Sequence, residues 1–283
     1  MERFGVRTPA KINLFLDVLD KRPDGYHEIR TVFHKIALYD TVTVEPIGSG
    51  IEIVCDHPLV PRDERNLCWK AAQVLIDRCD LRAGARIQIE KHIPVSSGLG
   101  GGSSDTAAVL RAMDALFGLD LSELTLQTVG AQLGADVPAF LAEEDCLYAE
   151  GIGDRLRPIS GGLDHDLVLI HPSIELPKGV EKTGWAYARL NRHPWTHPNP
   201  DPLIAGIEAG EIGQVTENLF NAFEPVWFEA FPVVEWLRAE LDRRKIPSLL
   251  CGAGPAVFAV TADLDDRFDR YGQIIRTQLG WKR

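Results

Sequence analysis

The sequence predicts an α+β protein, because strand patterns and helix patterns follow one another in an irregular order. Apolar residues alternate over residues 10–18, which is the period of a half-buried strand. A glycine-rich segment at residues 94–105 stands between a second strand pattern and a long helix pattern. Another helix pattern comes after these, so the order is strands, helix, strand, loop, helix, helix. This order is typical of α+β folds.

The N-terminal part of the chain is predicted to form strands. In the first strand, Lys11 and Asn13 lie on the face opposite the apolar positions. Those apolar positions are Ala10, Ile12, Leu14, Leu16 and Val18. Pro23-Asp24-Gly25 is a turn signal. Two further strands are expected over Thr41–Glu45 and Ile51–Cys55.

Three helices are predicted in the middle of the chain. Asn66 is a candidate N-cap for the first. Its apolar positions are Leu67, Ala71, Val74 and Leu75. The second carries apolar residues at helical spacing over residues 107–117, and Gly118 is its expected stop. The third begins at Ser122 and ends near Gly134.

The C-terminal part is predicted to begin near Gly161-Gly162, and its first feature is the apolar run Leu167–Ile170. The stretch from Trp195 to Pro202 holds three prolines, Pro202 among them, so no regular structure is expected there. A late strand is predicted over Val257–Val260. Before it, a helix is predicted from the spacing of Phe231, Val234, Leu237 and Leu241.

Composition excludes several classes of protein. The formal charge of −11 comes without a basic stripe, which argues against a nucleic-acid partner. The five cysteines are odd in number and far apart, so we expect reduced thiols and a cytoplasmic protein. A strand pattern begins almost at the N-terminus, so no signal or transit peptide is expected. No apolar run reaches membrane-spanning length, and we expect no membrane partner.

The glycine-rich segment is predicted to bind phosphate. It follows a strand pattern that includes Ile87, Ile89 and Ile93, and it opens a helix. Glycines let backbone N–H groups approach phosphate oxygens, and the positive end of the helix dipole faces the same point. A flexible loop is the alternative, but four glycines and four serines at a helix start favour the anion site. The expected phosphate-binding residues are Pro94, Val95, Ser96, Ser97, Gly98, Leu99, Gly100, Gly101, Gly102, Ser103 and Ser104.

Two common phosphate loops do not match this segment. A Walker-type loop requires a Gly-Lys pair, and the chain contains none. The dinucleotide fingerprint requires a third glycine, where Ser103 stands, and no acidic residue ends a strand at the expected distance.

Motifs along most of the chain resemble one family in order. They are Pro9–Leu16, Arg22–Ile29, Pro94–Ser104, Gly134–Pro138 and Gly252–Phe258. This series resembles the GHMP kinases and, within them, the 4-diphosphocytidyl-2-C-methylerythritol kinases. The segment Gly25-Tyr26-His27 separates that branch from the mevalonate, homoserine and galactose kinases.

The resemblance implies a two-lobed GHMP kinase fold. Residues 1–160 would form an N-terminal lobe like domain 2 of ribosomal protein S5, and residues 161–283 a ferredoxin-like C-terminal lobe. It also implies an activity: ATP- and Mg²⁺-dependent phosphorylation of the 2-hydroxyl of 4-diphosphocytidyl-2-C-methylerythritol in the non-mevalonate isoprenoid pathway. The small-molecule substrate would be the partner of a monomer or a weak homodimer. For this family the expected absence of a transit peptide favours a bacterial enzyme over a plastid precursor.

Lys11 and Asp136 are the expected catalytic residues. Phosphoryl transfer depends mainly on positioning and charge neutralisation. In the family, the lysine and aspartate at these positions act as a pair, in which the lysine keeps the carboxylate ionised and orients the hydroxyl. Without the resemblance, Lys11 reads as an exposed strand residue and Asp136 as an exposed loop acid. Pro138 predicts an extended backbone at Val137, which would hold Asp136 in a connection.

Four residues are expected to bind the substrate. Asn13 shares the face of Lys11 and offers a hydrogen bond. Tyr26 offers a flat face to a pyrimidine and His27 a hydrogen bond to the cytosine edge, although both also suit an ordinary turn. Phe33 either walls the same pocket or belongs to the core. A second aromatic wall is expected by analogy: Lys182 stands at its aligned position, which leaves Trp185 and Tyr187 as the alternatives.

Ser103 and Ser104 are candidates for contact with Mg²⁺ or a phosphate oxygen, with helix N-capping as the alternative. The last motif of the series, at residues 251–258, resembles the third motif of the GHMP kinases, and we call it the third motif. It departs from the family's Ser-Gly-Ser-Gly, because Cys251 and Ala253 replace the hydroxyl residues. Ser96-Ser97 replaces the more frequent Gly-Ala, and Asp105 stands where Asn is common. None of these changes touches the expected catalytic pair, so activity is expected.

Two other functions remain open on the sequence. One is a GHMP kinase that acts on another small alcohol, against which Gly25-Tyr26-His27 argues. The other is a non-catalytic nucleotide-binding relative. The presence of both Lys11 and Asp136 argues against it, because a binding protein needs neither.

Overall fold

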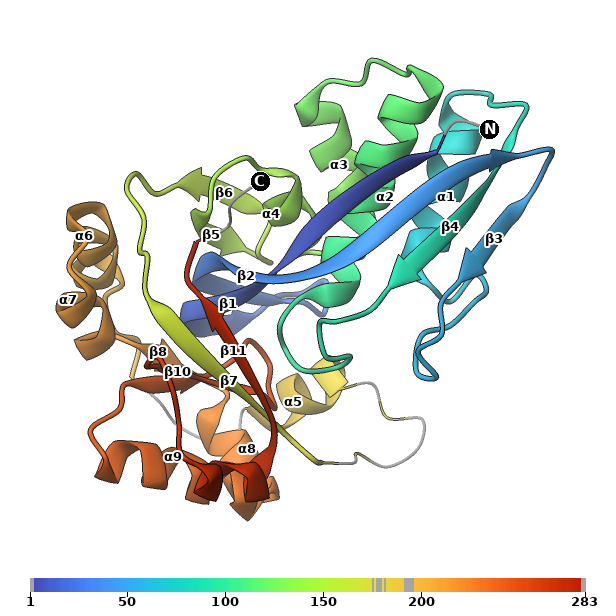
Figure 1. The fold of residues 1–283 in the computed structure, drawn as a ribbon. Helices are drawn as coiled ribbons and strands as arrows, with labels where there is room; N and C mark the ends of the chain where they lie inside the picture. The colour runs from blue at the N-terminus through green and yellow to red at the C-terminus, as the bar shows by residue number, and fades with distance from the viewer. Residues whose placement is uncertain (1–2, 175, 177–179, 181, 191–195, 281–283) are drawn as a thin grey trace. The chain divides into compact units, whose positions relative to one another are not determined.

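A computed structural model of the chain describes residues 3–174, 176, 180, 182–190 and 196–280 (Figure 1). The chain forms two compact units that interleave along the sequence. Unit 1 comprises residues 1–10, 38–95 and 100–143, and unit 2 comprises residues 11–37, 96–99 and 144–283. The lobes expected at residues 1–160 and 161–283 stay a prediction.

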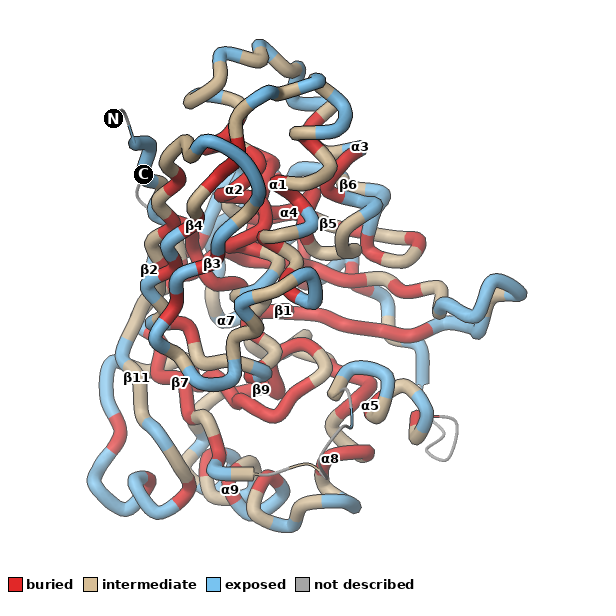
Figure 2. Tube along the Cα trace, turned by 90° about the vertical axis from the view of Figure 1, so that its right-hand side faces the viewer, coloured by how far each residue is buried: buried red, intermediate tan, exposed pale blue. Residues whose placement is uncertain are grey.

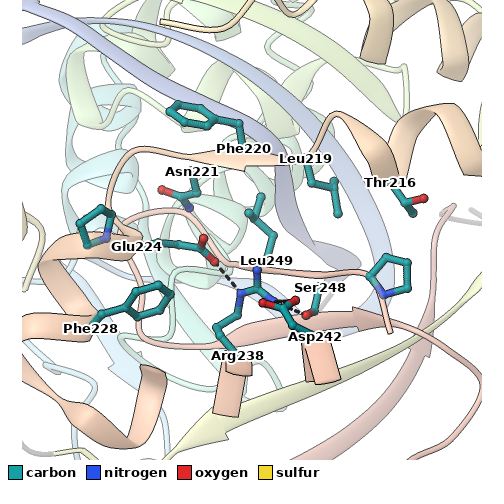
Figure 3. A pocket seen from close by; sticks show the side chains of 12 residues that line it. Thr216, Leu219, Phe220, Asn221, Glu224, Phe228, Arg238, Asp242, Ser248 and Leu249 are labelled. Atoms are coloured by element: carbon teal, nitrogen blue, oxygen red, sulfur yellow. Dashed lines mark hydrogen bonds and ion pairs between the residues drawn. The ribbon is translucent and has the colours of Figure 1, made fainter. Parts of the chain in front are cut away.

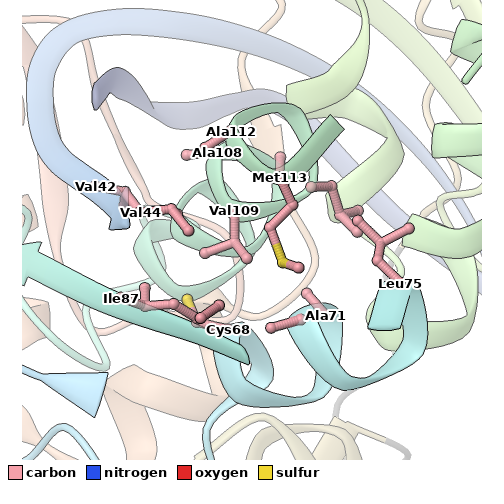
Figure 4. Close-up of a cluster of buried hydrophobic side chains, with 14 of the residues drawn as sticks. Val42, Val44, Cys68, Ala71, Leu75, Ile87, Ala108, Val109, Ala112 and Met113 are labelled. Carbon is pink, nitrogen blue, oxygen red and sulfur yellow. The ribbon is translucent and has the colours of Figure 1, made fainter. Parts of the chain in front are cut away.

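Unit 1 is a sheet covered by helices. Its strand order is β3-β4-β2-β1, in which β4 runs antiparallel to β2 and parallel to β3. Apolar side chains of the strands meet those of α1 and α2 in one core, which includes Val44, Leu75 and Val109 (Figure 4). In chain order its elements are β1 (Phe4–Lys21) and β2 (His27–Ile47), which both continue in unit 2, then β3 (Ile51–Val54), α1 (Leu67–Arg78), β4 (Gly84–Glu90), α2 (Gly101–Phe117), α3 (Glu123–Leu133) and α4 (Val137–Leu141).

The helix signals of the sequence are confirmed in unit 1. The Asn66 side chain accepts a hydrogen bond from the N–H of Cys68 at the start of α1. Ser122 accepts from the N–H of Thr125 at the start of α3, which ends at Gly134. Gly118 ends α2 in the left-handed conformation that glycine adopts most easily.

Unit 2 contains two sheets. The first has the order β6-β5-β2-β1-β8, and the second is antiparallel with the order β11-β7-β10-β9. Side chains of α8 and α9 pack in the core of this unit, among them Trp227 and Leu237. The elements are β5 (Cys146–Gly151), β6 (Arg155–Pro158), β7 (Asp166–Pro172), α5 (Lys182–Leu190), α6 (Asp201–Ala209), α7 (Ile212–Glu217), β8 (Phe220–Asn221), α8 (Glu224–Ala230), α9 (Pro232–Arg243), β9 (Ser248–Leu250), β10 (Val257–Val260), a 3-10 helix (Asp266–Tyr271) and β11 (Gly272–Gln278).

β1 is buried along its middle, whereas its first residues and its end near the turn are exposed (Figure 2). Residues 8–18 of this strand are buried on both faces, Lys11, Asn13 and Asp17 included. No helix in the described ranges is long and apolar enough to span a membrane.

Three expectations about local structure were wrong. Ile93 lies beyond the end of β4 at Glu90, although it is buried. Val137 is the first residue of α4 instead of extended, because Pro138 is tolerated in the first turn of a helix. Pro202 likewise lies in the first turn of α6. Residues 196–199 before it are irregular as expected, and Trp195 lies outside the described residues.

Candidate active site

The middle of the glycine-rich loop is held on two sides within unit 2. The N–H of Lys11 donates to the carbonyl of Leu99 at 3.0 Å, and the N–H of Ala256 donates to the carbonyl of Ser97 at 3.0 Å. Gly98 has a φ of +92°, and a Cβ atom there would lie 2.0 Å from the carbonyl oxygen of Cys251. The loop therefore packs backbone to backbone against the third motif, at a position that only glycine fits.

The end of the loop opens α2 in unit 1. Gly100 is the N-cap, with a left-handed backbone and no side chain to accept from the first-turn N–H groups. These groups belong to Gly101, Gly102 and Ser103. A 17-residue helix also directs the positive end of its dipole to this point. Uncapped first-turn N–H groups and a helix dipole are the two features that favour an anion at a helix N-terminus.

The two serines after the glycines have different surroundings. Ser104 is buried: its hydroxyl donates to the carbonyl of Pro9 at 2.6 Å and lies 2.6 Å from the hydroxyl of Thr8. Ser103 is only half-buried, and its Oγ lies 3.8 Å from where a Cβ on Gly134 would be. Neither serine is the N-cap of α2, because Gly100 takes that place.

Lys11 is held by a chain of hydrogen bonds in unit 2. Its Nζ donates to Asn13 Oδ1 at 2.6 Å, and Asn13 Nδ2 donates to Thr31 Oγ1 at 2.7 Å. The Thr31 hydroxyl in turn donates to a main-chain carbonyl of β1. The ring of Phe33 lies 5.0 Å from Lys11 Nζ, and a Cβ on Gly252 would lie 3.2 Å from that nitrogen. Lys11, Asn13, Phe33 and the third motif therefore lie together.

Asp136 lies in unit 1, between the end of α3 and the start of α4. It is the N-cap residue of α4, but its side chain makes no capping hydrogen bond. Its side chain is half-buried, so the reading as an exposed loop acid does not fit. Lys11 belongs to unit 2, so the pairing of the two residues stays a prediction.

One of the two expected pyrimidine residues, His27, lies against α5 in unit 2. The rings of His27 and Tyr187 stack with centroids 4.6 Å apart at 27°. His27 Nε2 is buried without a hydrogen-bond partner in the described part of the chain, and burial lowers the pKa of this imidazole. Tyr26 is 59% exposed. Of the two alternative aromatic walls, Tyr187 lies on His27, whereas Trp185 packs against Trp227.

Two side chains of unit 2 hydrogen-bond the backbone at the start of the third motif. Asn221 Nδ2 donates to the carbonyls of Leu250 and Gly252, at 2.8 and 2.9 Å. Glu224 accepts from the N–H of Leu250 at 3.2 Å. Both side chains line a cavity of about 350 Å³, where Glu224 also pairs with Arg238 at 2.7 Å (Figure 3). Burial raises the pKa of Glu224.

Comparison with known proteins gives the family. A model of the GHMP kinases N terminal domain matches residues 66–144. The chain is 38% identical over 262 residues to 4-diphosphocytidyl-2-C-methyl-D-erythritol kinase of Acetivibrio thermocellus, which covers 92% of this chain and 90% of that protein. It is 35% identical over 278 residues to the kinase of the same name from Clostridium botulinum, which covers 95% and 97% of the two chains. The chain belongs to the 4-diphosphocytidyl-2-C-methyl-D-erythritol kinase family.

Solved structures agree with this membership. A crystal structure of 4-(cytidine 5'-diphospho)-2C-methyl-D-erythritol kinase superimposes with a TM-score of 0.80 at 29% identity, covering 99% of this chain and 100% of that one. Homoserine kinase from Cytophaga hutchinsonii superimposes with a TM-score of 0.69 at 16% identity, covering 99% and 95%, which supports the fold alone. The α+β GHMP kinase fold predicted from the sequence is confirmed.

Two departures from the motifs of the kinase family have a clear place in the structure. Cys251 is fully buried, with its N–H bonded to the carbonyl of Ala256 at 2.7 Å. Lys182 Nζ donates to the carbonyl of Gly254 at 2.6 Å, so this lysine holds the third motif instead of supplying an aromatic wall.

The thiols of this kinase are expected to resist alkylation. Burial raises the pKa of Cys251 to about 12 and that of Cys68 well above its usual value, and it also raises that of Cys146. Since the thiolate is the nucleophile, iodoacetamide at pH 8 should modify only the half-buried Cys79 quickly in the folded protein. Intact-mass spectrometry should show one fast label in native protein and five in denaturant. Rapid native labelling of Cys251 would contradict its burial.

Sequence reasoning missed several residues that hold the loops. Asn221 and Glu224 were not singled out, nor were Asp40 and Lys91, which are buried in unit 1. The only sequence signal was an acidic residue, Asp40, directly before the strand predicted over Thr41–Glu45, and it fits a solvated strand edge equally well. No group of three or more His, Cys, Asp or Glu residues in the described ranges is arranged to hold a metal ion.

Proposed function

We propose that the chain transfers the γ-phosphoryl group of ATP to the 2-hydroxyl of 4-diphosphocytidyl-2-C-methyl-D-erythritol, a step of the non-mevalonate isoprenoid pathway. The observation that carries this proposal is similarity over more than nine-tenths of both chains to kinases named for this substrate. The alcohol differs among GHMP kinases, so substrate identity needs its own test.

The residues around the glycine-rich loop fit a nucleoside triphosphate. Gly98 leaves no space for a side chain beside Cys251, and Gly100 leaves the first turn of α2 uncapped by a side chain. Backbone N–H groups of the loop would hold the phosphate oxygens. We assign the phosphates to residues 94–104.

We assign Lys11 and Asp136 to the reacting hydroxyl. Lys11 is buried and positively charged, and Asn13 holds its ammonium group in place. Asp136 would accept or orient the hydroxyl proton, while Lys11 keeps developing negative charge stabilised. An ionised Asp is a weak base for an alcohol, so its positioning of the hydroxyl contributes more than full proton removal.

We assign Mg²⁺ to Ser103. A bound Mg²⁺ would neutralise phosphate charge and keeps most of its water ligands, so a single hydroxyl contact suits it. The half-buried hydroxyl of Ser103 has room for such a contact, whereas that of Ser104 is already bonded to Pro9 and Thr8. We therefore place Ser104 in support of α2.

We assign the cytosine ring to His27, Tyr26 and Tyr187. His27 Nε2 is buried and unpartnered among the described residues, so it can bond a base edge, and Tyr187 fixes the plane of its ring. The exposed ring of Tyr26 would cover the base. Asn13 and Phe33 would contact the substrate beside Lys11.

The test is release of ADP from ATP and Mg²⁺ with four alcohols: the cytidyl substrate, mevalonate, homoserine and galactose. Turnover with the cytidyl substrate alone is expected. Turnover with another alcohol would support the kinase activity but contradict the proposed substrate. If the folded protein binds ATP but turns over none of the four alcohols, the proposed catalytic activity is wrong and a nucleotide-binding role is favoured. Replacing Mg²⁺ by EDTA in the same assay is expected to abolish turnover.

We further propose that the enzyme works in the cytoplasm as a monomer or weak homodimer. The five cysteines are free thiols in the structure, which suits a reducing compartment. Light scattering over a tenfold concentration range gives the mass: a stable larger assembly would contradict this proposal.

A further inference from the structure

Three ionisable side chains are buried together in unit 1, outside the residues assigned above, and burial raises the pKa of one of them, Asp105, to about 8. Asp40 of β2 is fully buried, and the side chains of Lys91 and Asp105 are each 5% exposed. Lys91 Nζ donates to Asp40 Oδ2, and also to Asp105 Oδ2 at 2.7 Å. Burial disfavours the ammonium group, yet the charges of Asp105 and Asp40 raise the pKa of Lys91, so it stays charged. We call these three residues the buried triad.

Asp40 holds the start of the glycine-rich loop. Its Oδ1 accepts from the N–H groups of His92 and Ile93, at 2.6 and 2.9 Å. These two residues come directly before Pro94, the first residue of the loop. Asp40 thus fixes the backbone between β4 and the loop with two hydrogen bonds to a charged acceptor.

Lys91 connects the same carboxylate to the end of the loop. Asp105 lies on α2, directly after Ser104. A Cβ on Gly101 would lie 3.1 Å from Lys91 Nζ and 3.0 Å from a methyl carbon of Ile93. The triad therefore packs directly beneath the first residue of α2, where the loop ends.

We propose that the buried triad fixes the distance between the two ends of the phosphate loop, and that Asp40 is a positioning residue for nucleotide binding. The inference rests on the proposed role of this loop. A buried group of paired charges often stabilises a protein no more than apolar residues of the same volume do. A contribution to stability therefore does not by itself explain the triad. It does supply directed hydrogen bonds that apolar residues cannot, and an anion cradle depends on the placement of its N–H groups.

The test compares Asp40→Asn with Glu45→Gln. Both residues lie on β2 in unit 1, and both are ion-paired, Glu45 with Arg86 at 2.7 Å. Asp40→Asn is expected to raise the KM for ATP about tenfold and change the KM for the alcohol less than about twofold. Glu45→Gln should change neither. Calorimetric titration with MgADP should show the same loss of affinity, and this measurement needs no turnover, so it stands even if the alcohol is misassigned.

A second pair of variants separates positioning from folding. Asp105→Ala removes the acceptor on α2 and should also raise the KM for ATP, whereas Asp105→Asn keeps an oxygen for Lys91 and should restore most of the affinity. Thermal unfolding shows whether each variant is folded at the assay temperature. Unchanged MgADP affinity in folded Asp40→Asn, or an equal rise in both KM values, would overturn the proposal. Should Asp40→Asn not fold, equal ATP affinity in the two Asp105 variants would overturn it.

Discussion

Replacing Gly98 by Ala is expected to lower kcat/KM by about 100-fold or more, because a displacement of about 1 Å in a binding loop has an effect of that size. The new Cβ would lie 2.0 Å from the carbonyl oxygen of Cys251 and 2.9 Å from its carbon, and backbone atoms cannot rotate away. The φ of +92° adds strain of about 1–3 kcal/mol for any other residue. The loop or the third motif must therefore move, and the loop is the proposed phosphate site. Steady-state kinetics with varied ATP and a melting temperature measure the two effects.

Two variants control this result. Gly162→Ala changes an exposed glycine in unit 2 that has no atom within 4 Å of the new Cβ, so activity and melting temperature should stay as in the wild type. Gly252→Ala approaches the same contact from the other side, since its Cβ would lie 2.8 Å from the carbonyl oxygen of Gly98. It should therefore resemble Gly98→Ala. A wild-type KM for ATP in Gly98→Ala would mean that the loop does not hold phosphate in this conformation.

Helices were predicted well because their ends carry local chemistry. Asn66, Ser122 and Gly118 each satisfy or stop a helix through atoms within a few residues, so the sequence alone contains the signal. α4 was missed because Pro138 disfavours a helical residue before it in general, and the preference was overridden here by burial of the whole five-residue helix.

Strands were predicted less completely because their burial depends on partners elsewhere in the chain. β2 runs from His27 to Ile47, yet only residues 41–45 were predicted. Its middle buries polar residues such as His34 and Asp40, which hide the alternation that a half-buried strand would show. β8 has two residues and pairs with β1, which no local pattern can predict.

The site shows the same division between local and distant signals. The loop was predictable because its glycines and the helix after it are adjacent in sequence. The contact of Gly98 with Cys251 joins residues more than a hundred positions apart, and no single sequence reveals it. The sequence could not decide between Trp185 and Tyr187 either. Both lie on α5, and only the rings that each packs against distinguish them.

Changing Lys11 and Asp136 together is expected to cost no more than changing one of them. Lys11→Met removes the ammonium group that Asn13 holds, and Asp136→Asn replaces a carboxylate with a neutral amide of the same size. Each change should lower kcat by about 10²–10⁴-fold, the usual range for a group that moves or orients a proton. The effects of substitutions at residues that act as one unit are strongly non-additive. The kcat of the double variant should therefore equal that of the less active single variant. Asp120→Asn, an exposed position in unit 1, is the matched control and should keep full activity.

The double-mutant comparison tests the pairing directly, because the two residues come from different units and their pairing is inferred from the family. If the lysine serves only the phosphates and the aspartate only the hydroxyl, the two losses multiply, and the pair as proposed is wrong. If both residues act on the same hydroxyl, the second substitution should not lower kcat further. MgADP affinity near the wild-type value in all three variants would place the loss in the chemical step, because the glycine-rich loop would still hold the nucleotide.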